Sequence, residues 1–173
     1  PKAHATAYMI STLRLGWYKV YRPVEYYAAY FTVRSEDLDG VLVMKGKDSV
    51  KQQMKDIKMK GNEATVKENA ALATLQIVNE MFERGIKVLP IDLYKSDAYK
   101  FLVEDGKIRL PFSSLPGVGE NVAKGLQNAG KNGKYISVDE ISTRSGASKT
   151  IVELMGEIGM LNGIPKSSQL SFF

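Results

Sequence analysis

Ser113-Ser114-Leu115-Pro116-Gly117-Val118-Gly119-Glu120 is the stretch of this 173-residue chain that indicates most about its fold and chemistry. It leads into a helical pattern with Val122, Leu126 and Ala129 on one side. Glycine permits a positive φ and lets a backbone approach an anion without a Cβ in the way. The first amides of a helix are unpaired and lie at the positive end of its dipole. The stretch therefore predicts a turn that binds phosphate.

A turn of this kind is the signature of a helix-hairpin-helix hairpin, which holds DNA by its backbone and reads little sequence. Lys124, about one helical turn further on, adds a charge contact. A second helix-turn-helix unit follows at Ser145–Lys149, although Gly146-Ala147-Ser148 lacks the Gly-x-Gly pattern. Since such hairpins pack in pairs that straddle a duplex, the second unit favours DNA binding. The candidate DNA-binding residues are Pro116, Gly117, Val118, Gly119, Lys124, Ser148 and Lys149.

The residues around the second hairpin also have helical patterns. Ser137 and Glu140 have the spacing of a capping box and predict a short helix that reaches about Arg144. The next helix directs four apolar residues toward a core: Ile151, Leu154, Met155 and Ile158. We expect residues 111–162 to form a tandem helix-hairpin-helix unit and residues 163–173 to form a flexible tail. An ordinary tight turn between helices is the alternative interpretation of the first hairpin.

The front of the chain is predicted to be helical. Helical patterns cover residues 5–18, 24–33, 49–60 and 66–84. Pro23 suits the first turn of the second of these helices, and Thr65 with Glu68 has capping-box spacing at the fourth. Gly85 fits a left-handed cap at the end of that helix.

A small sheet is predicted between the two helical parts. Residues 87–90 have a strand pattern, and residues 99–103 and 107–110 flank Glu104-Asp105-Gly106, which is a hairpin signal. The expected fold class is therefore mainly α with a small β element, an α+β fold.

Composition excludes several kinds of site. There is no cysteine, and the single histidine is His4, so thiolate chemistry and sites with several histidines cannot be internal to this chain. We expect no metal ligands and no catalytic residues here. No apolar run approaches the ~18–20 residues that a membrane span needs, so no membrane role is expected. The net charge of +5 favours polyanionic partners only slightly.

The chain ends in a pattern that suits docking in a groove. Gln169 supplies an amide that donates and accepts, while Leu170, Phe172 and Phe173 can bury apolar area beside Ser171. The alternative is a tail that packs on its own domain.

Several of these motifs, in this order, resemble the C-terminal end of the PolC-type alpha subunit of bacterial DNA polymerase III. The stretches that carry the resemblance are Lys2-Ala3-His4-Ala5, Tyr26-Tyr27-Ala28-Ala29-Tyr30-Phe31, Arg84-Gly85-Ile86, Val88-Leu89-Pro90-Ile91, Leu115 to Lys124, and Gln169 to Phe173. Gln169 to Phe173 is similar to the sliding-clamp-binding pentapeptide of that family, with Phe172 where leucine or isoleucine is usual.

The resemblance implies roles for these segments. Residues 1–110 would be part of the polymerase fingers, with Lys2, His4, Tyr8 and Ser11 as candidate contacts to incoming dNTP or template. Primer-template DNA and the beta sliding clamp would be the macromolecular partners. The family's nucleotidyl transfer uses palm carboxylates with Mg²⁺, which lie upstream, so this fragment is expected to be inactive alone. A monomer, acting in a cytoplasmic replisome at the nucleoid, is expected.

Two other classes of protein remain open. A stand-alone helix-hairpin-helix module from a DNA repair or recombination protein would also carry paired hairpins, but its first hundred residues or so would have no reason to resemble polymerase fingers. A structural helical interaction domain would use the glycines only as a turn and would show no salt-sensitive DNA binding.

Overall fold

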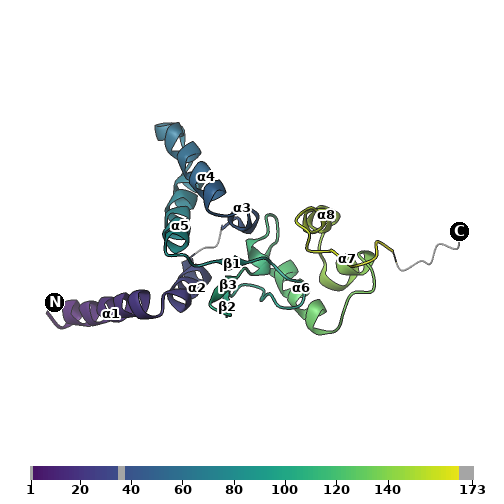
Figure 1. The fold of residues 1–173 in the computed structure, drawn as a ribbon, viewed down its shortest axis with the longest axis horizontal. Helices are drawn as coiled ribbons and strands as arrows, with labels where there is room; N and C mark the ends of the chain where they lie inside the picture. Colours follow the sequence, from purple (N-terminus) through teal and green to yellow (C-terminus); the bar gives the residue numbers. More distant parts are fainter. Residues whose placement is uncertain (1, 35–37, 168–173) are drawn as a thin grey trace, which may run out of the picture.

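The structure is a computed structural model that describes residues 2–34 and 38–167 (Figure 1). Helices dominate it and a small sheet lies between the front and back helices, which confirms the predicted fold class. The described front of the chain forms five α-helices and a 3-10 turn: α1 (Lys2–Tyr21), α2 (Pro23–Arg34), α3 (Gly40–Met44), α4 (Lys47–Lys60), η1 (Gly61–Glu63) and α5 (Val66–Glu83).

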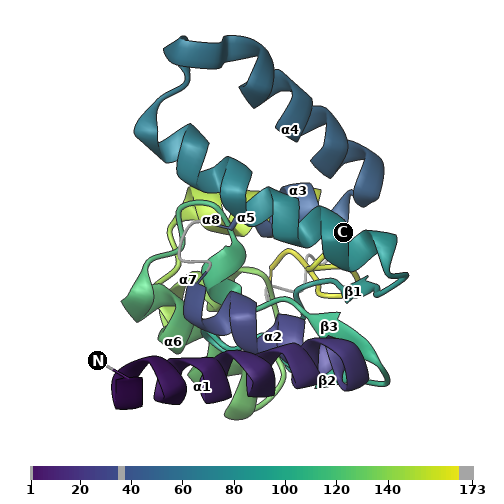
Figure 2. The same ribbon diagram turned by 90° about the vertical axis from the view of Figure 1, so that its left-hand side faces the viewer.

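Helices α1 and α2 follow one another directly, and α1 runs across the front of the molecule in the view of Figure 2. Pro23 is the first residue of α2, where its missing N–H leaves no hydrogen bond unmade, as predicted. Tyr27 and Phe31 of α2 are buried in the core. Within Lys2–Tyr21, all of which the structure describes, no residue is buried.

Helices α4 and α5 form a hairpin that projects from the body (Figure 1). The predicted capping box at the start of α5 is confirmed: the Thr65 hydroxyl accepts from the Glu68 amide at 3.1 Å, and the Glu68 carboxylate accepts from the Thr65 amide at 2.8 Å. Gly85 follows the helix with φ +77°, the left-handed conformation expected of it.

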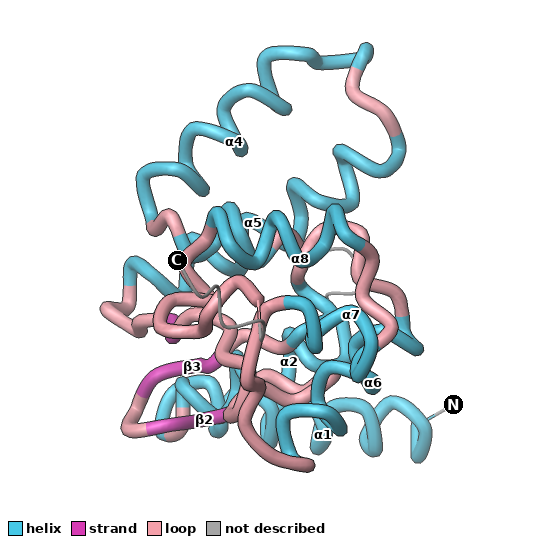
Figure 3. Tube along the Cα trace, turned by 90° about the vertical axis from the view of Figure 1, so that its right-hand side faces the viewer, coloured by secondary structure: helices cyan, strands magenta, loops and turns pink. Residues whose placement is uncertain are grey.

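The sheet has three short strands in the order β1-β3-β2: β1 (Val88–Leu89), β2 (Leu102–Glu104) and β3 (Lys107–Arg109). Asp105 and Gly106 join β2 to β3, and both have positive φ, as a tight hairpin requires (Figure 3). The strand predicted from residue 99 starts later. The Asp97 carboxylate accepts hydrogen bonds from the Tyr99 and Lys100 amides, which bends the chain there.

The back of the chain contains a 3-10 turn, η2 (Phe112–Ser114), and three helices: α6 (Glu120–Lys131), α7 (Asp139–Ser145) and α8 (Lys149–Glu157). The predicted capping box at Ser137 is wrong. Val138 is the N-cap of α7, and the buried Ser137 hydroxyl has no partner among the described residues. The Glu140 carboxylate accepts instead from the Ile136 amide at 3.0 Å, because the helix begins after Val138.

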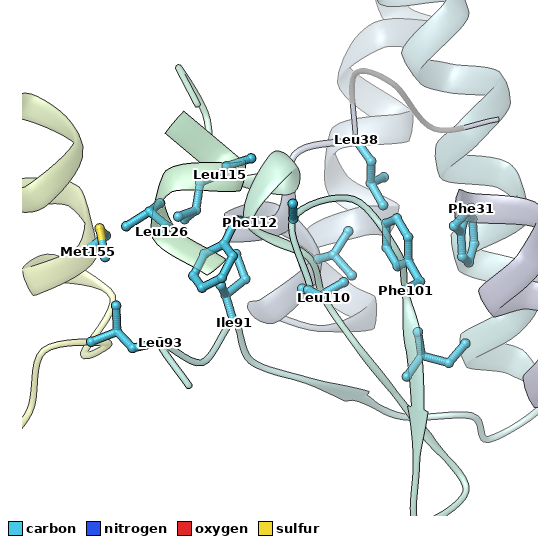
Figure 4. Close-up of a cluster of buried hydrophobic side chains, with 14 of the residues drawn as sticks. Phe31, Leu38, Ile91, Leu93, Phe101, Leu110, Phe112, Leu115, Leu126 and Met155 are labelled. Atoms are coloured by element: carbon cyan, nitrogen blue, oxygen red, sulfur yellow. The ribbon is translucent and has the colours of Figure 1, made fainter. Parts of the chain in front are cut away.

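Buried side chains from the front and the back form one continuous cluster, part of which is drawn in Figure 4. At one end the rings of Phe31 and Phe101 lie 5.6 Å apart, and further along Phe112, Leu126 and Met155 are fully buried. This core holds the first hairpin against the sheet and α8. The division into residues 1–110, 111–162 and 163–173 stays a prediction.

None of the helices in residues 2–34 and 38–167 is long and apolar enough to cross a membrane. Nor does that part of the chain bring together three or more side chains of the kinds that hold a metal ion.

Candidate nucleic-acid interface

The first hairpin is a tight turn between η2 and α6. The Val118 amide donates to the Leu115 carbonyl at 3.1 Å, which closes a four-residue turn. Pro116 occupies its second position and Gly117 its third, with φ +81°. Those features are typical of a type II turn, whose third position has a positive φ that favours glycine. Buried Leu115 anchors the turn, so Pro116 and Gly117 face solvent.

Gly119, the N-cap of α6, has no such conformational reason to be glycine. Its φ is −83° and its ψ 174°, values that any residue adopts. A Cβ built there would meet no described atom within 4 Å. Serine, aspartate or asparagine would cap the helix better. Glycine therefore leaves the space above the turn empty. It also leaves the amides of the first helical turn without a side-chain cap.

Those amides are available to an outside acceptor. The first hydrogen bond of α6 runs from the Ala123 amide to the Gly119 carbonyl at 3.0 Å. For the amides of residues 120–122, no acceptor is recorded among the described residues. Unpaired amides at a helix N-terminus favour an anion, and backbone donors beside an exposed glycine suit a phosphate.

Two charged side chains of α6 border the turn. The Lys124 ammonium lies 2.6 Å from the Glu120 carboxylate, and both side chains are more than half exposed. Their hydrogen bond lowers the pKa of Glu120 and raises the pKa of Lys124. Lys124 also lies 5.8 Å from the ring centre of Tyr99, whose hydroxyl donates to the Glu120 carbonyl at 2.7 Å. Lys124 is thus near the turn as predicted, but it already has a partner.

A groove runs beside the first hairpin. Its walls come from residues 113–119, from Leu38 and Asp39 before α3, and from Lys67 near the start of α5. The Asp39 carboxylate accepts from the Leu42 amide at 3.0 Å, so its role includes capping α3. Lys67 is not predictable from the sequence, because only the fold brings the start of α5 to the hairpin.

The second hairpin repeats the backbone of the first with different side chains. Gly146 ends α7 with φ +75°, and Ser148 is the N-cap of α8. The Ser148 hydroxyl accepts from the Ile151 amide at 3.4 Å, so one amide of this helix start has an internal partner. Ala147 between them is buried, while Ser148 and Lys149 are exposed.

The charges on the two hairpins are reversed. Helix α6 begins with Glu120 and carries Lys124 four residues later; α8 begins with Lys149 and carries Glu153 four residues later. The Lys149–Glu153 pair is loose, at 3.8 Å, and the Lys149 side chain is 91% exposed. The first helical residue after the turn is therefore a cation in the second hairpin and a carboxylate in the first.

Close packing fixes one hairpin against the other. A Cβ at Gly125 of α6 would lie 2.1 Å from the carbonyl oxygen of Ser145, the last residue of α7. Real Cβ atoms do not approach a backbone so closely, so only glycine allows these two helices to meet there. Gly125 positions the hairpins, and this role was not predicted from the sequence because no local pattern marks such a contact.

Arg144 is a second positioning residue. Its guanidinium donates to the carbonyls of Ala129, Gly133 and Lys134 at 2.6, 3.0 and 3.2 Å, which satisfies the C-terminal end of α6 and the link that follows. It also lies over the ring of Tyr135 at 4.5 Å. Arg144 therefore stabilises the end of α6 and is not a candidate for binding DNA phosphate.

The four predicted nucleotide or template contacts all lie on α1, and all are exposed. His4, Tyr8 and Ser11 share one face, where the rings of His4 and Tyr8 are 4.6 Å apart. The Ser11 hydroxyl donates to the Ala7 carbonyl at 3.1 Å. Lys2 precedes His4 by two residues and so lies roughly 160° round the helix. The structure thus groups three of the four residues.

The predicted clamp-binding residues lie outside the described part of the chain. They are Gln169, Leu170, Ser171, Phe172 and Phe173. Their role stays a prediction from the sequence.

A family model matches the part of the chain that holds the two hairpins. Residues 85–170 match the family model described as "Helix-hairpin-helix motif", a range that includes both hairpins.

Named relatives match the whole chain. It is 45% identical over 173 residues to a protein of Caldanaerobacter subterraneus subsp. tengcongensis and 44% identical over 173 residues to one of Clostridium perfringens. It is 47% identical over 175 residues to a protein of Streptococcus pyogenes serotype M5. Each of these is named "DNA polymerase III PolC-type". All of this chain is covered in each comparison, but it spans only 12% of each relative's length.

The match includes the first hundred residues, which a repair module with paired hairpins would have no reason to share. Together with the paired hairpins, it shows that this chain belongs to the family of PolC-type DNA polymerase III sequences.

Proposed function

We propose that this chain binds the sugar-phosphate backbone of duplex DNA through the first hairpin, with little dependence on base sequence. The observation that carries the proposal is Gly119. Neither its φ nor its surroundings require glycine, yet glycine leaves the start of α6 open and uncapped. The approach of an outside anion to the backbone explains that choice.

The expected contact is simple in its chemistry. A phosphate oxygen accepts hydrogen bonds from amides of the first turn of α6, at the positive end of the helix dipole. Pro116 and Gly117 form the exposed edge of the turn, and Val118, half-buried, holds it on the core. Backbone amides read phosphate and not bases, so binding is independent of sequence.

The second hairpin provides a further contact in this proposal. Lys149 and the Ser148 hydroxyl face solvent at the start of α8, and Gly125 fixes this hairpin relative to the first. Lys124 joins the contact when a phosphate replaces Glu120 as its partner. Two hairpins that hold two stretches of backbone grip a duplex more firmly than either one alone.

We further propose that this segment acts within a longer DNA-directed DNA polymerase. There it would hold duplex product while α1 contributes contacts to incoming dNTP and template. His4, Tyr8 and Ser11 share the face that would make such contacts, and Lys2 would reach a phosphate from another side. The Mg²⁺ ions and carboxylates of nucleotidyl transfer would belong to the rest of the polymerase, so the segment alone is expected to be inactive.

The residues at 169–173 would dock on the sliding clamp. The support for this is their composition, a glutamine followed by apolar side chains, and the resemblance of the pentapeptide to the family's clamp-binding peptide. A tethered polymerase stays at a high effective concentration near the primer end, which is the physical basis of processive synthesis.

The test is a pair of titrations. Fluorescent primer-template DNA is titrated with wild type and Gly119→Ala at several salt concentrations, and sliding clamp is titrated with wild type and a variant without residues 169–173. Gly156→Ala is the matched control, because a Cβ there meets only Leu161, at 4.0 Å. Far-UV circular dichroism checks that every variant is folded.

We expect Gly119→Ala to weaken DNA binding while Gly156→Ala does not, and the shortened chain to lose the clamp but keep DNA. If Gly119→Ala binds DNA as well as wild type, the first hairpin is not the DNA site. Unchanged clamp binding by the shortened chain would overturn the proposal for the tail alone.

A further inference from the structure

Helix α1 carries an apolar stripe that the described fold leaves uncovered. Met9, Leu13, Trp17 and Val20 recur at helical spacing, and their exposed fractions are 61%, 66%, 51% and 63%. The Trp17 ring rests on the ring of Tyr21 at 5.1 Å, and Tyr21 is itself 66% exposed. Large apolar side chains gathered on one exposed face mark an interaction surface.

The contacts of α1 with the rest of the fold lie on the other side of the helix. Lys19 pairs with Glu80 of α5 at 2.8 Å, and Arg84 donates to the Lys19 carbonyl at 2.6 Å. Leu15 and Tyr18 line an apolar groove that α1 shares with α2, and this groove is open, since the two side chains are 59% and 52% exposed. Residues two apart differ by about 200° round a helix, so this side lies opposite Leu13 and Val20.

We propose that the stripe of Met9, Leu13, Trp17 and Val20 docks onto another part of the longer polypeptide to which this segment belongs. The relatives that match this chain carry it as 12% of their length, so most of each polypeptide lies outside the segment. A helix with apolar residues on more than one side is suited to burial between two surfaces. The α2 groove supplies one surface, and the partner segment supplies the other.

Charge indicates the chemistry of the partner surface. The sequence of α1 has no acidic residue, and helical spacing places Arg14 beside Ile10 and Tyr21 at the edge of the stripe. The complementary surface is therefore apolar with carboxylates at its rim. A nucleic acid does not fit the stripe, because phosphate contacts need clustered cations and here apolar side chains occupy the centre.

This arrangement is compatible with the nucleotide contacts proposed for α1, but does not depend on them or on DNA binding by the hairpins. Docking through Leu13 and Val20 leaves the face of His4, Tyr8 and Ser11 open. The docking proposal rests only on family membership and on the exposed stripe. If it fails, the proposal that the hairpins bind DNA is unaffected.

Trp17 is a built-in reporter, because it is the only tryptophan of the chain. We would replace it with 5-fluorotryptophan by biosynthetic labelling and record the ¹⁹F resonance. The probe is the Caldanaerobacter relative truncated to lack the segment that matches this chain. Addition of this probe is expected to shift and broaden the resonance, while dilution of the chain alone leaves it unchanged.

Two double variants make the test specific. Leu13→Glu/Val20→Glu places charges on the stripe and should weaken the interaction at least about tenfold, the effect of losing one central anchor. Ala5→Glu/Thr12→Glu adds the same charge beside the stripe and should change affinity less than about threefold. Both pairs are exposed, so circular dichroism should match wild type.

Three outcomes would overturn the proposal. If the resonance shifts with the concentration of the chain alone, the stripe binds a second copy. If the truncated relative causes no shift, that part of the polypeptide does not cover Trp17. Equal loss of binding in both double variants would show a general charge effect and no docking stripe.

Discussion

The two hairpins have similar backbone conformations and differ in the residue types at matching positions. Each has a left-handed glycine, Gly117 or Gly146, followed by a residue that packs inward and then a helix N-cap. The N-cap is glycine in the first and serine in the second. The first residue of the helix is Glu120 in one and Lys149 in the other.

This difference separates two ways of meeting a phosphate. The first hairpin keeps its amides unpaired and its surface open, at the cost of a weak helix cap. The second satisfies part of its helix start with Ser148 and offers a side-chain cation instead. DNA binding by the first hairpin should therefore depend on the conformation of its backbone, and DNA binding by the second should depend on the charge of Lys149.

The largest effect should come from breaking the contact that fixes one hairpin against the other. Gly125→Ala places a Cβ against the Ser145 carbonyl, at 2.1 Å without movement, so α6 and α7 must separate. We expect a loss of about 1–3 kcal/mol in the free energy of unfolding, as for other overpacked contacts. Chemical denaturation measures it, and DNA affinity should fall as well.

Gly16→Ala is the matched control, because it is also a helical glycine but has no described atom within 4 Å of the added Cβ. It should not destabilise the chain, and the better helix propensity of alanine favours the folded state by up to ~1 kcal/mol. If Gly125→Ala is as stable as Gly16→Ala, the close contact between α6 and α7 is not needed for the fold.

The next largest effect should come from making the first hairpin like the second. Gly119→Ser introduces a helix cap, and its side chain fills the space where a phosphate approaches. We expect DNA affinity to fall about tenfold, or ~1.4 kcal/mol, while thermal stability stays equal or rises slightly. Fluorescence anisotropy and a thermal melt measure the two effects on the same sample.

Ser148→Gly is the reciprocal change. It removes the cap of α8 and the hydroxyl proposed to meet phosphate, so stability should fall by a few tenths of a kcal/mol. DNA affinity should fall less than in Gly119→Ser, because Lys149 remains at the start of α8. A loss of affinity equal to that of Gly119→Ser would mean that both hairpins bind through their backbones, and the distinction between them would be wrong.

A smaller effect is expected from the charges. Lys149→Gln removes the most exposed cation of the second hairpin and should lower the slope of log affinity against log salt by about 0.9, one phosphate contact. Lys107→Gln, on the distant β2–β3 hairpin, should leave the slope unchanged. An unchanged slope in Lys149→Gln would remove the second hairpin from the DNA interface.

Much of the fold could be predicted from local patterns. The capping box at Thr65, the Asp105-Gly106 turn and the left-handed Gly85 each depend on neighbours in sequence, and all three were confirmed. The hairpin at Gly117 belongs to the same class, because its turn type depends on Pro116 and on the glycine itself.

Features that depend on distant contacts could not be predicted in this way. Ser137 has the spacing of a cap, but the helix starts after it and its hydroxyl is buried. Gly125 is glycine because Ser145 lies against it. The apolar pattern of α1 correctly indicated a helix, but in this fold the residues of its apolar face remain exposed.

The smallest effect tests the reversed charges. Glu120 is a carboxylate beside the proposed phosphate site, and its pairing with Lys124 lowers its pKa, so it stays ionised at neutral pH. Glu120→Gln should therefore tighten DNA binding about two- to fourfold at low salt and release Lys124 for a phosphate. Glu153→Gln should have a smaller effect, because Lys149 is already 91% exposed and 3.8 Å from Glu153. Weaker binding by Glu120→Gln would mean that Glu120 holds Lys124 in its DNA-binding position, so that the first hairpin too depends on the placement of a charge.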